Sequence, residues 1–302
     1  MHTFPARTAI FTLSLAFAAA AHAGTFQRQV PADPHGEVDI SNVAGSIAIS
    51  GWDNSAVAVS ADLPGGTERV KVTSRQGRTR VCVTYGSGGC DAPIFSGGKE
   101  PVRLELHVPR GSEIDASGVS ARITSHGMLG VQHLRTVSGD IEADLGSGDD
   151  DVKSVSGAIR LHGSGQDGTL HASTVSGDLS ISDIAGELDA RTVNGTLTAG
   201  LSPARAARLN TTSGAIGLNA HLAPGGTIEV ETVSGNEKID VSAAAGYSYD
   251  ARTFSGNIEN CFGQQPDRSH YGPGNRLDGS RGAANGRIRL RSLSGDISLC
   301  DR

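Results

Sequence analysis

The sequence predicts an all-β protein, a single-stranded β-solenoid with about 18–21 residues per coil and an N-terminal β cap. Three observations predict it. A motif close to Thr-Val-Ser-Gly-Asp-Ile returns at this spacing, apolar and polar residues alternate within each copy, and the 302 residues include 41 glycines but only 4 % aromatic residues. Because stacked repeats bury a shared core that no single repeat can form, small aliphatic residues suffice to fill it.

The first 23 residues have the pattern of a secretory signal peptide. Arg7 supplies a positive charge, residues 9–21 form an apolar run, and Ala21-His22-Ala23 resembles a cleavage site. The apolar run is shorter than the roughly 20 residues that a transmembrane helix needs. We therefore expect an exported protein, periplasmic or extracellular, whose mature chain starts at Gly24 and is not inserted in a membrane.

Residues 24–110 are expected to form the N-terminal β cap or module. Short alternating segments are interrupted there by turn-forming stretches, such as Pro64-Gly65-Gly66 and residues 86–89. Residues 111–302 hold the repeats. The clear copies of the motif are residues 136–141, 154–159, 174–179, 192–197, 211–216, 232–237, 253–258 and 292–297.

Alternation within each copy predicts a half-buried strand. Val137, Gly139 and Ile141 would face the core, and Ser138 and Asp140 would face solvent. The same pattern places the motif valine of every copy inside.

A second alternating segment precedes each motif, and its phase slips at the Thr-Val junction. Leu188 and Thr192 share one parity, whereas Val193 and Gly195 share the other. Since a one-residue slip reverses the side of a flat strand, both sets face inward only if the chain turns a corner there. Each coil is therefore expected to contain two strands, with the motif glycine where backbones approach closely.

A long loop at residues 262–286 is expected because the last two motif glycines, Gly256 and Gly295, lie two repeats apart. Loops on rigid scaffolds often carry binding residues, and the alternative is a loop without fixed structure. The candidate binding residues in it are Arg268, His270, Tyr271, Arg276 and Arg281.

The chain has four cysteines, an even number that suits disulfides in an exported protein. Cys261 and Cys300 each follow a motif glycine by five residues, so stacking would bring them within bonding distance. Cys82 and Cys90 would close a short hairpin loop. Four buried free thiols are the alternative.

Charge and spacing argue against several classes of function. The net charge is -6 without a basic stripe, which disfavours nucleic-acid binding. No Cys-x-x-Cys pair occurs, and no metal or other cofactor is expected. The acidic run at residues 149–151 could bind calcium, but a solvated acidic turn between coils is the favoured interpretation.

Asp140, Asp178 and Asp296 recur at one repeat position and could serve glycoside chemistry. However, Ala158 and Thr196 occupy the same position in other copies, which favours an ordinary exposed strand site. The motif serine lacks the Gly-x-Ser-x-Gly context of a nucleophile. No catalytic residues are therefore expected.

The Val-Ser-Gly-Asp-Ile repeats resemble a widespread family of exported bacterial β-repeat proteins known as "putative adhesins". Residues 40–53 resemble the usual opening of that family and residues 104–111 its entry to the repeats, so the resemblance covers nearly the whole mature chain. The departures are the insertion at residues 261–286 and Glu237, which replaces an apolar residue. The resemblance implies surface adhesion and no catalytic residues.

The expected function is a non-catalytic, adhesin-like protein of the cell envelope or surface. It would bind a surface polymer or an envelope protein through a face of the coils or the loop at residues 262–286. The alternatives are a polysaccharide-active enzyme on a β-helix and a periplasmic accessory protein in envelope-stress signalling.

Overall fold

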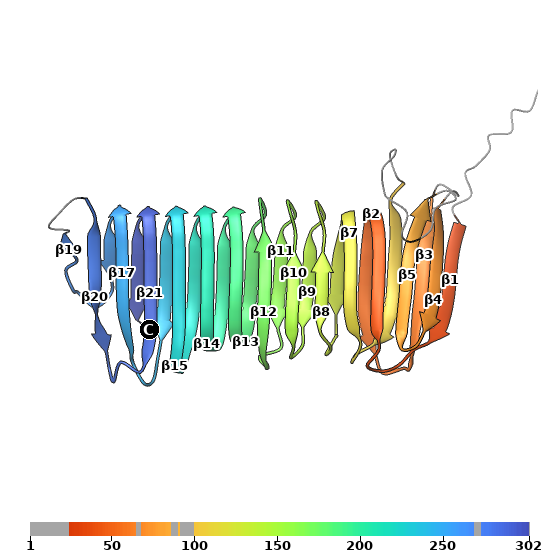
Figure 1. Cartoon of the computed structure of the whole chain (residues 1–302), viewed down its shortest axis with the longest axis horizontal. Coiled ribbons are helices and arrows are strands. Elements are labelled where there is room, and N and C mark those ends of the chain that lie inside the picture. Colours follow the sequence, from red (N-terminus) through yellow and green to blue (C-terminus); the bar gives the residue numbers. More distant parts are fainter. Residues whose placement is uncertain (1–23, 65–67, 86–89, 91–99, 269–272, 302) are drawn as a thin grey trace, which may run out of the picture.

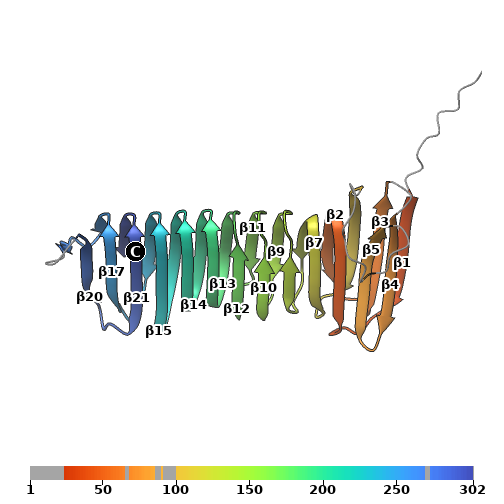
Figure 2. The same ribbon diagram turned by 45° about the horizontal axis from the view of Figure 1, so that its top comes forward.

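The computed structural model describes residues 24–64, 68–85, 90, 100–268 and 273–301, which form one long stack of strands (Figures 1 and 2). The predicted signal peptide, residues 1–23, lies outside the described residues. Within the described ranges all regular secondary structure is β, and no helix there could span a membrane.

The N-terminal region contains β1 (Gly24–Pro31), β2 (Glu37–Trp52), β3 (Ala56–Leu63), β4 (Glu68–Arg75), β5 (Arg78–Tyr85) and β6 (Val102–Pro109). The repeats contain β7 (Glu113–His126), β8 (Gln132–Arg135), β9 (Ile141–Leu145), β10 (Asp149–Lys153), β11 (Ile159–Gly163), β12 (Asp167–Thr174), β13 (Leu179–Asn194), β14 (Leu197–Ser213), β15 (Ile216–Ser234) and β16 (Glu237–Ser242). The C-terminal end contains β17 (Tyr247–Ser255), β18 (Ile258–Asn260), β19 (Asp267–Arg268), β20 (Asn275–Arg281), β21 (Gly286–Ser294) and β22 (Ile297–Asp301).

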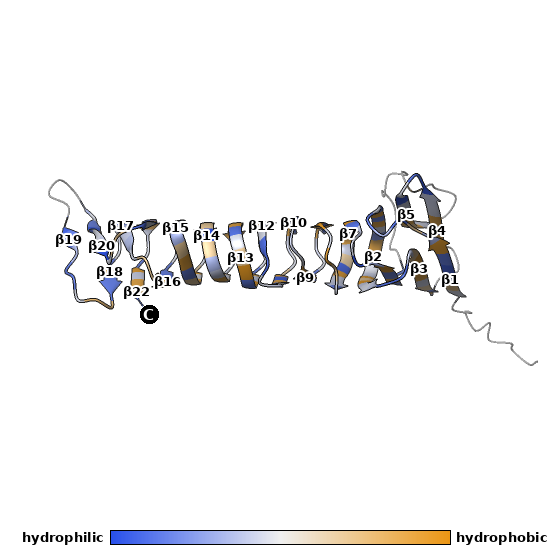
Figure 3. Cartoon of the chain, turned by 90° about the horizontal axis from the view of Figure 1, so that it is seen from below, coloured by the Kyte–Doolittle hydropathy of each residue, from blue (hydrophilic) through white to orange (hydrophobic). Residues whose placement is uncertain are grey.

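The strands lie in two rows, and each turn of the repeat region, here called a rung, contributes to both. Row A runs through β4, β5, β2, β7, β8, β10, β12, β13, β14, β15, β21, β17 and β20. Row B runs through β1, β3, β6, β2, β7, β9, β11, β13, β14, β15, β16, β22 and β18. Seen from below, the rungs follow one another along a narrow body (Figure 3).

The prediction of a single-stranded β-solenoid is wrong. Seven strands pair in a closed parallel barrel, in the order β7, β8, β10, β12, β13, β11, β9 and back to β7, and the other strands lie outside it. The ring closes because β7 and β13 continue unbroken from one row to the other. Alternation of buried and exposed side chains is the same whether a strand ends at a corner or continues around it. The sequence therefore does not reveal that the seven strands close into a barrel.

The rungs also depart from chain order near the C-terminus. β21 and β22, the last strands of the chain, lie between the rung of β15 and β16 and the rung of β17 and β18. Within the predicted loop at residues 262–286, β20 pairs antiparallel with the outer side of β17. The segment therefore extends row A rather than forming only a loop.

Equivalent residues of consecutive repeats are neighbours, as the spacing predicted. Leu179 pairs with Leu197, and both are buried. A Cβ atom built on Gly195 would lie 2.2 Å from the carbonyl oxygen of Gly177. Glycine is required at this position because the preceding rung leaves no room for a side chain.

Candidate functional site

The most unusual surface feature is a line of exposed apolar side chains along one edge of the stack, here called the apolar row. Apart from Leu129, every exposed large hydrophobic residue in the described ranges lies two residues before the motif glycine or, for Val119, before the equivalent Ala121. Apolar groups exposed in a continuous patch mark interaction sites more often than single ones do. The members of the row are Val119, Val137, Val155, Val175, Val193, Val233, Leu293 and Phe254.

The motif valine was predicted to lie inside, and that prediction is wrong: Val137 is 46 % exposed. The one-residue slip in alternation was expected to be absorbed by a bend between Thr136 and Val137 that kept both side chains inside. Thr136 is buried, Val137 and Ser138 both face outward, and the chain is buried again at Gly139 and Ile141. Two consecutive residues therefore point out, which alternation alone does not predict.

A trough of about 700 Å³ follows the apolar row across the rungs of β12 to β15 and β21. Its lining includes the exposed apolar residues Val193, Val233 and Leu293, and also the charged residues Arg191 and Glu231. The buried threonines of the motif also line it. The trough can therefore contact an elongated molecule with an apolar face and polar edges.

Three threonine and serine residues of the trough carry buried hydroxyls that lack a hydrogen-bond partner in the described structure: Thr211, Thr232 and Ser292. In earlier rungs the equivalent hydroxyl is satisfied. The Gly177 N–H, for example, donates to Thr174 Oγ1 at 3.2 Å.

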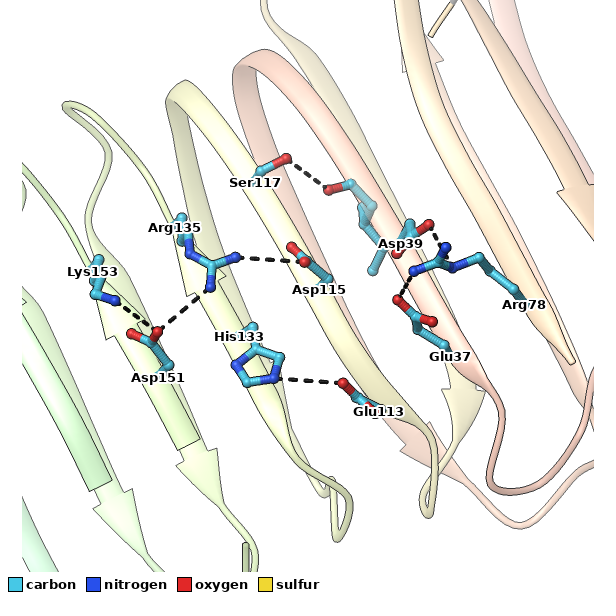
Figure 4. Close-up of polar contacts among 11 residues, drawn as sticks. Glu37, Asp39, Arg78, Glu113, Asp115, Ser117, His133, Arg135, Asp151 and Lys153 are labelled. Carbon is cyan, nitrogen blue, oxygen red and sulfur yellow. Dashed lines mark hydrogen bonds and ion pairs between the residues drawn. The ribbon is translucent and has the colours of Figure 1, made fainter. Parts of the chain in front are cut away.

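Beside the trough, the outer side of row A carries a lattice of ion pairs, whose N-terminal part is shown in Figure 4. Arg135 lies 3.5 Å from both Asp115 and Asp151, and Lys153 Nζ lies 2.7 Å from Asp151. Arg78 pairs in the same way with Glu37 and Asp39. Most charges on this face are mutually neutralised, and exposed pairs of this kind contribute little to stability.

A second hollow, here called the arginine pocket, lies at the C-terminal end of the apolar row and has a volume of about 620 Å³. Its lining includes four arginines, two aspartates and the ring of Phe254, which is 54 % exposed. Arg291 and Ser292 line both hollows, so the trough and the pocket adjoin. The charged residues of the lining are Arg252, Arg268, Arg276, Arg291, Asp267 and Asp278.

The structure separates the residues predicted for the binding loop. Arg268 and Arg276 line the arginine pocket. Arg281 does not; it pairs with Asp301 at 2.9 Å and lies over the ring of Phe262. His270 and Tyr271 lie outside the described residues.

Both predicted disulfides are present. Cys261 and Cys300 are bonded with a Cα–Cα distance of 4.9 Å, and Cys82 and Cys90 are bonded with a distance of 5.8 Å. The first joins β22 to the segment after β18 and so closes the rung that is out of chain order. Two disulfides are typical of a protein from an oxidising compartment outside the cytoplasm.

The aspartates that recur in the motif accept hydrogen bonds from backbone N–H groups of the neighbouring rung. Asp140 Oδ1 accepts the N–H of Ala158 at 3.0 Å, and Asp178 Oδ1 accepts the N–H of Thr196 at 2.8 Å. Asp296 does the same for Asn257. Each carboxylate thus links its rung to the next.

The acidic run at residues 149–151 was expected to be a solvated turn, and it is instead part of β10. Asp150 is buried, and burial raises its pKa to about 6, although its Oδ1 accepts the N–H of Gln132. Asp151 points outward to Lys153. Among the described residues no group of three or more His, Cys, Asp or Glu side chains is arranged to hold a metal ion.

Glu237 is 1 % exposed and occupies an inward position between Ile216 and Ile297 of the neighbouring rungs. Neither carboxylate oxygen has a partner within the part of the chain that the structure describes. Burial, with a smaller contribution from the charge of Glu231, raises the pKa of Glu237 to about 9. The side chain is therefore protonated at neutral pH.

No family model matches the chain, and no curated protein matches it. Similar solved structures include one described as a putative lipid binding protein from Parabacteroides distasonis (12 % identity, 92 % of this chain and 96 % of that chain, TM-score 0.39). Others are a putative adhesin from Bacteroides fragilis (12 %, 93 % and 99 %, TM-score 0.37) and a putative cell adhesion protein from Clostridium sporogenes (9 %, 93 % and 100 %, TM-score 0.25). The adhesin names agree with the resemblance in the repeat motif, and the likeness extends to no ligand or activity.

Sequence reasoning missed the apolar row. A signal was present, because the position that holds valine in most copies holds the larger Leu293 and Phe254 near the C-terminus. A crowded core between two fixed rungs tolerates such enlargement poorly, whereas an exposed edge accepts it.

Proposed function

We propose that the protein is an exported, non-catalytic, adhesin-like protein of the cell envelope or surface that binds a linear surface polysaccharide along the trough. One observation carries the proposal: the apolar row, in which a single repeat position supplies almost all the exposed large hydrophobic residues of the part of the chain that the structure describes. Burial of this exposed area by a ligand would be favourable.

The lining of the trough favours a polysaccharide over a purely apolar ligand. Sugar rings have apolar C–H faces and polar edges, and the lining of the trough combines the apolar Val193 and Leu293 with the charged Arg191 and Glu231. Because the same lining recurs from rung to rung, a repetitive polymer could make equivalent contacts along its length. The non-catalytic character is supported by the aspartates of the motif, whose carboxylates are engaged with backbone N–H groups.

The test is a glycan-array and cell-surface polysaccharide binding assay on the mature chain. The triple variant Val193→Ser, Val233→Ser, Leu293→Ser should lower the affinity at least tenfold without unfolding the stack, since all three side chains are exposed. Leu129→Ser is the matched control, because Leu129 is 61 % exposed and lies off the row. Equal binding by the triple variant and the wild type, or capture of a protein but of no polysaccharide, would contradict the proposal.

A further inference from the structure

We infer that the arginine pocket recognises an acidic sugar residue of the bound polysaccharide, one that carries a carboxylate, as in a hexuronate. The inference rests on the proposed function and adds the chemical class of the ligand. It is argued from the arginines of the pocket, the one guanidinium in it without a partner among the described residues, and the exposed aromatic ring on its rim.

The pocket is rich in arginine. Its lining has four guanidinium groups and two carboxylates, in a protein with net charge -6. Asp250 and Glu231, which are not part of the lining, pair with Arg252, Arg276 and Arg291, so among the described residues Arg268 is the cation left to attract an anion.

Three of the four arginines already have partners. Arg252 Nε lies 2.8 Å from Asp250, Arg276 Nε lies 2.9 Å from Asp278, and Arg291 lies 3.9 Å from Glu231. Within the described residues Arg268 has no ion-pair or hydrogen-bond partner. Its planar guanidinium can bind a carboxylate through two parallel hydrogen bonds.

The backbone holds Arg268 beside its neighbours. It belongs to β19, which pairs antiparallel with β20 so that Arg268 lies opposite Asn275 and Asp267 lies opposite Arg276. β20 in turn pairs with β17, where Arg252 lies opposite Arg276. The pairing of β19, β20 and β17 thus brings side chains from three strands to one hollow.

Phe254 and Asp267 distinguish a sugar from a simple anion. Phe254 presents an exposed ring on which the C–H face of a pyranose can pack. Asp267 lines the same hollow and has no ion pair among the described residues, so its carboxylate is available to accept hydrogen bonds from sugar hydroxyls. A site that only collected anions would gain nothing from either group.

The experiment measures binding of the mature protein to oligogalacturonate and to its methyl ester by calorimetry. The acid should bind at least tenfold more tightly than the ester, since a charge-assisted pair is lost on esterification. Arg268→Gln should remove most of this preference, and Phe254→Ala should weaken both ligands. Arg160→Gln is the matched control, an exposed arginine on β11 away from the pocket.

The outcomes separate the two proposals. Equal binding of acid and ester would overturn the acidic-sugar assignment and leave polysaccharide binding along the trough intact. Equal binding of poly-glutamate and oligogalacturonate would show that the pocket recognises charge alone and would also overturn it. An Arg268→Gln variant with unchanged preference would place the acid elsewhere and overturn the assignment. Unchanged polysaccharide binding by the triple variant of the trough would instead contradict the proposed function itself.

Discussion

The early and late rungs of the stack are built from the same motif but turn their corners in two ways. At β8, β10 and β12 the N–H of the motif glycine donates to the buried hydroxyl of the same corner, as Gly157 does to Ser154 at 2.9 Å. At β14, β15 and β21 it donates to the next rung, as Gly235 does to the Ser294 carbonyl at 3.1 Å.

The late corners keep the strand ladder continuous and leave the buried hydroxyls of Thr211, Thr232 and Ser292 unpaired in the described structure. The trough lies mainly over these rungs. The buried Glu237 belongs to the same part of the stack. The comparison suggests that local stability is lower where the proposed binding surface lies, as is common for functional sites.

The largest expected change in stability tests a feature that the early and late rungs share, the close backbone approach at the motif glycine. A Cβ atom on Gly157 would lie 1.8 Å from the Gly139 oxygen, and one on Gly235 would lie 1.9 Å from the Gly214 oxygen. Gly157→Ala and Gly235→Ala should each cost about 3 kcal/mol or more in free energy of unfolding, because backbone must move. Denaturant titration should show a similar loss in both halves.

Gly217→Ala is the control, since the nearest side-chain atom would be 4.0 Å from the new Cβ. It should be neutral or slightly stabilising. If Gly157→Ala left the free energy of unfolding unchanged while Gly235→Ala lowered it, the early and late rungs would not share the close backbone approach at the motif glycine.

The next largest change in stability is expected for the buried carboxyl groups, Glu237 in the late rungs and Asp150 in the early rungs. Glu237→Ile should raise the free energy of unfolding by about 3 kcal/mol at pH 7, because one pKa unit corresponds to about 1.4 kcal/mol and the pKa is raised from 4.5 to about 9. In the wild type this group's contribution is fully present below pH 4.5 and is lost as the pH rises towards 9. The advantage of the variant should therefore grow from pH 5 to pH 9 in thermal melts.

Asp150→Ala is the matched change in the early half. It removes the acceptor of the Gln132 N–H, 2.8 Å away, and should destabilise by about 1–2 kcal/mol at pH 4, where the carboxyl, whose pKa burial raises from 3.8 to about 6, is not penalised by ionisation. If both substitutions destabilised the protein, the contrast between a partnered and an unpartnered buried acid would be wrong.

A smaller effect distinguishes the two corners directly. Thr174→Val deletes the acceptor of the Gly177 N–H and should cost about 1 kcal/mol. Thr232→Val deletes an unpartnered hydroxyl and should be neutral or stabilising. The two valines have nearly the same shape as threonine, so chemical denaturation of the pair measures the hydroxyls, and equal changes in both would refute the distinction.

The smallest effect concerns the inter-rung aspartates. Asp178→Ala should cost about 0.5–1 kcal/mol through the lost bond to the Thr196 N–H, and it should leave polysaccharide binding unchanged. Glu259→Ala, at another exposed strand position, serves as the control for charge removal. Loss of an acidic-glycan depolymerising activity in the Asp178 variant would instead support the enzyme alternative.

The sequence predicted the parts of the fold that follow from spacing and alternation. Neighbouring rungs, the close approach at Gly177 and the Cys261–Cys300 bond all depend on equivalent positions being stacked, and stacking follows from the period. The closed barrel and the insertion of β21 and β22 depend on backbone pairing between rungs, which the side-chain pattern does not encode.

The candidate site was predicted in part. Arg268 and Arg276 were singled out from the composition of one segment, and they do meet in a hollow. The outward turn of Val193 was missed because alternation assigns each residue to the opposite side from the one before it, whereas Val193 and Asn194 both face solvent at the corner. Neighbouring rungs decide that geometry, and one repeat in isolation does not.

The most direct test of the central claim measures whether the motif valine faces solvent along the stack. Val193→Cys and Leu197→Cys would each be exposed to a thiol reagent under native conditions, with the two disulfides intact. The account predicts that the thiol at position 193 reacts at nearly the rate of an unfolded control and that the thiol at position 197 is protected, since Val193 is 40 % exposed and Leu197 is 0 % exposed. Protection at position 193 equal to that at position 197 would contradict the apolar row and the binding surface built on it.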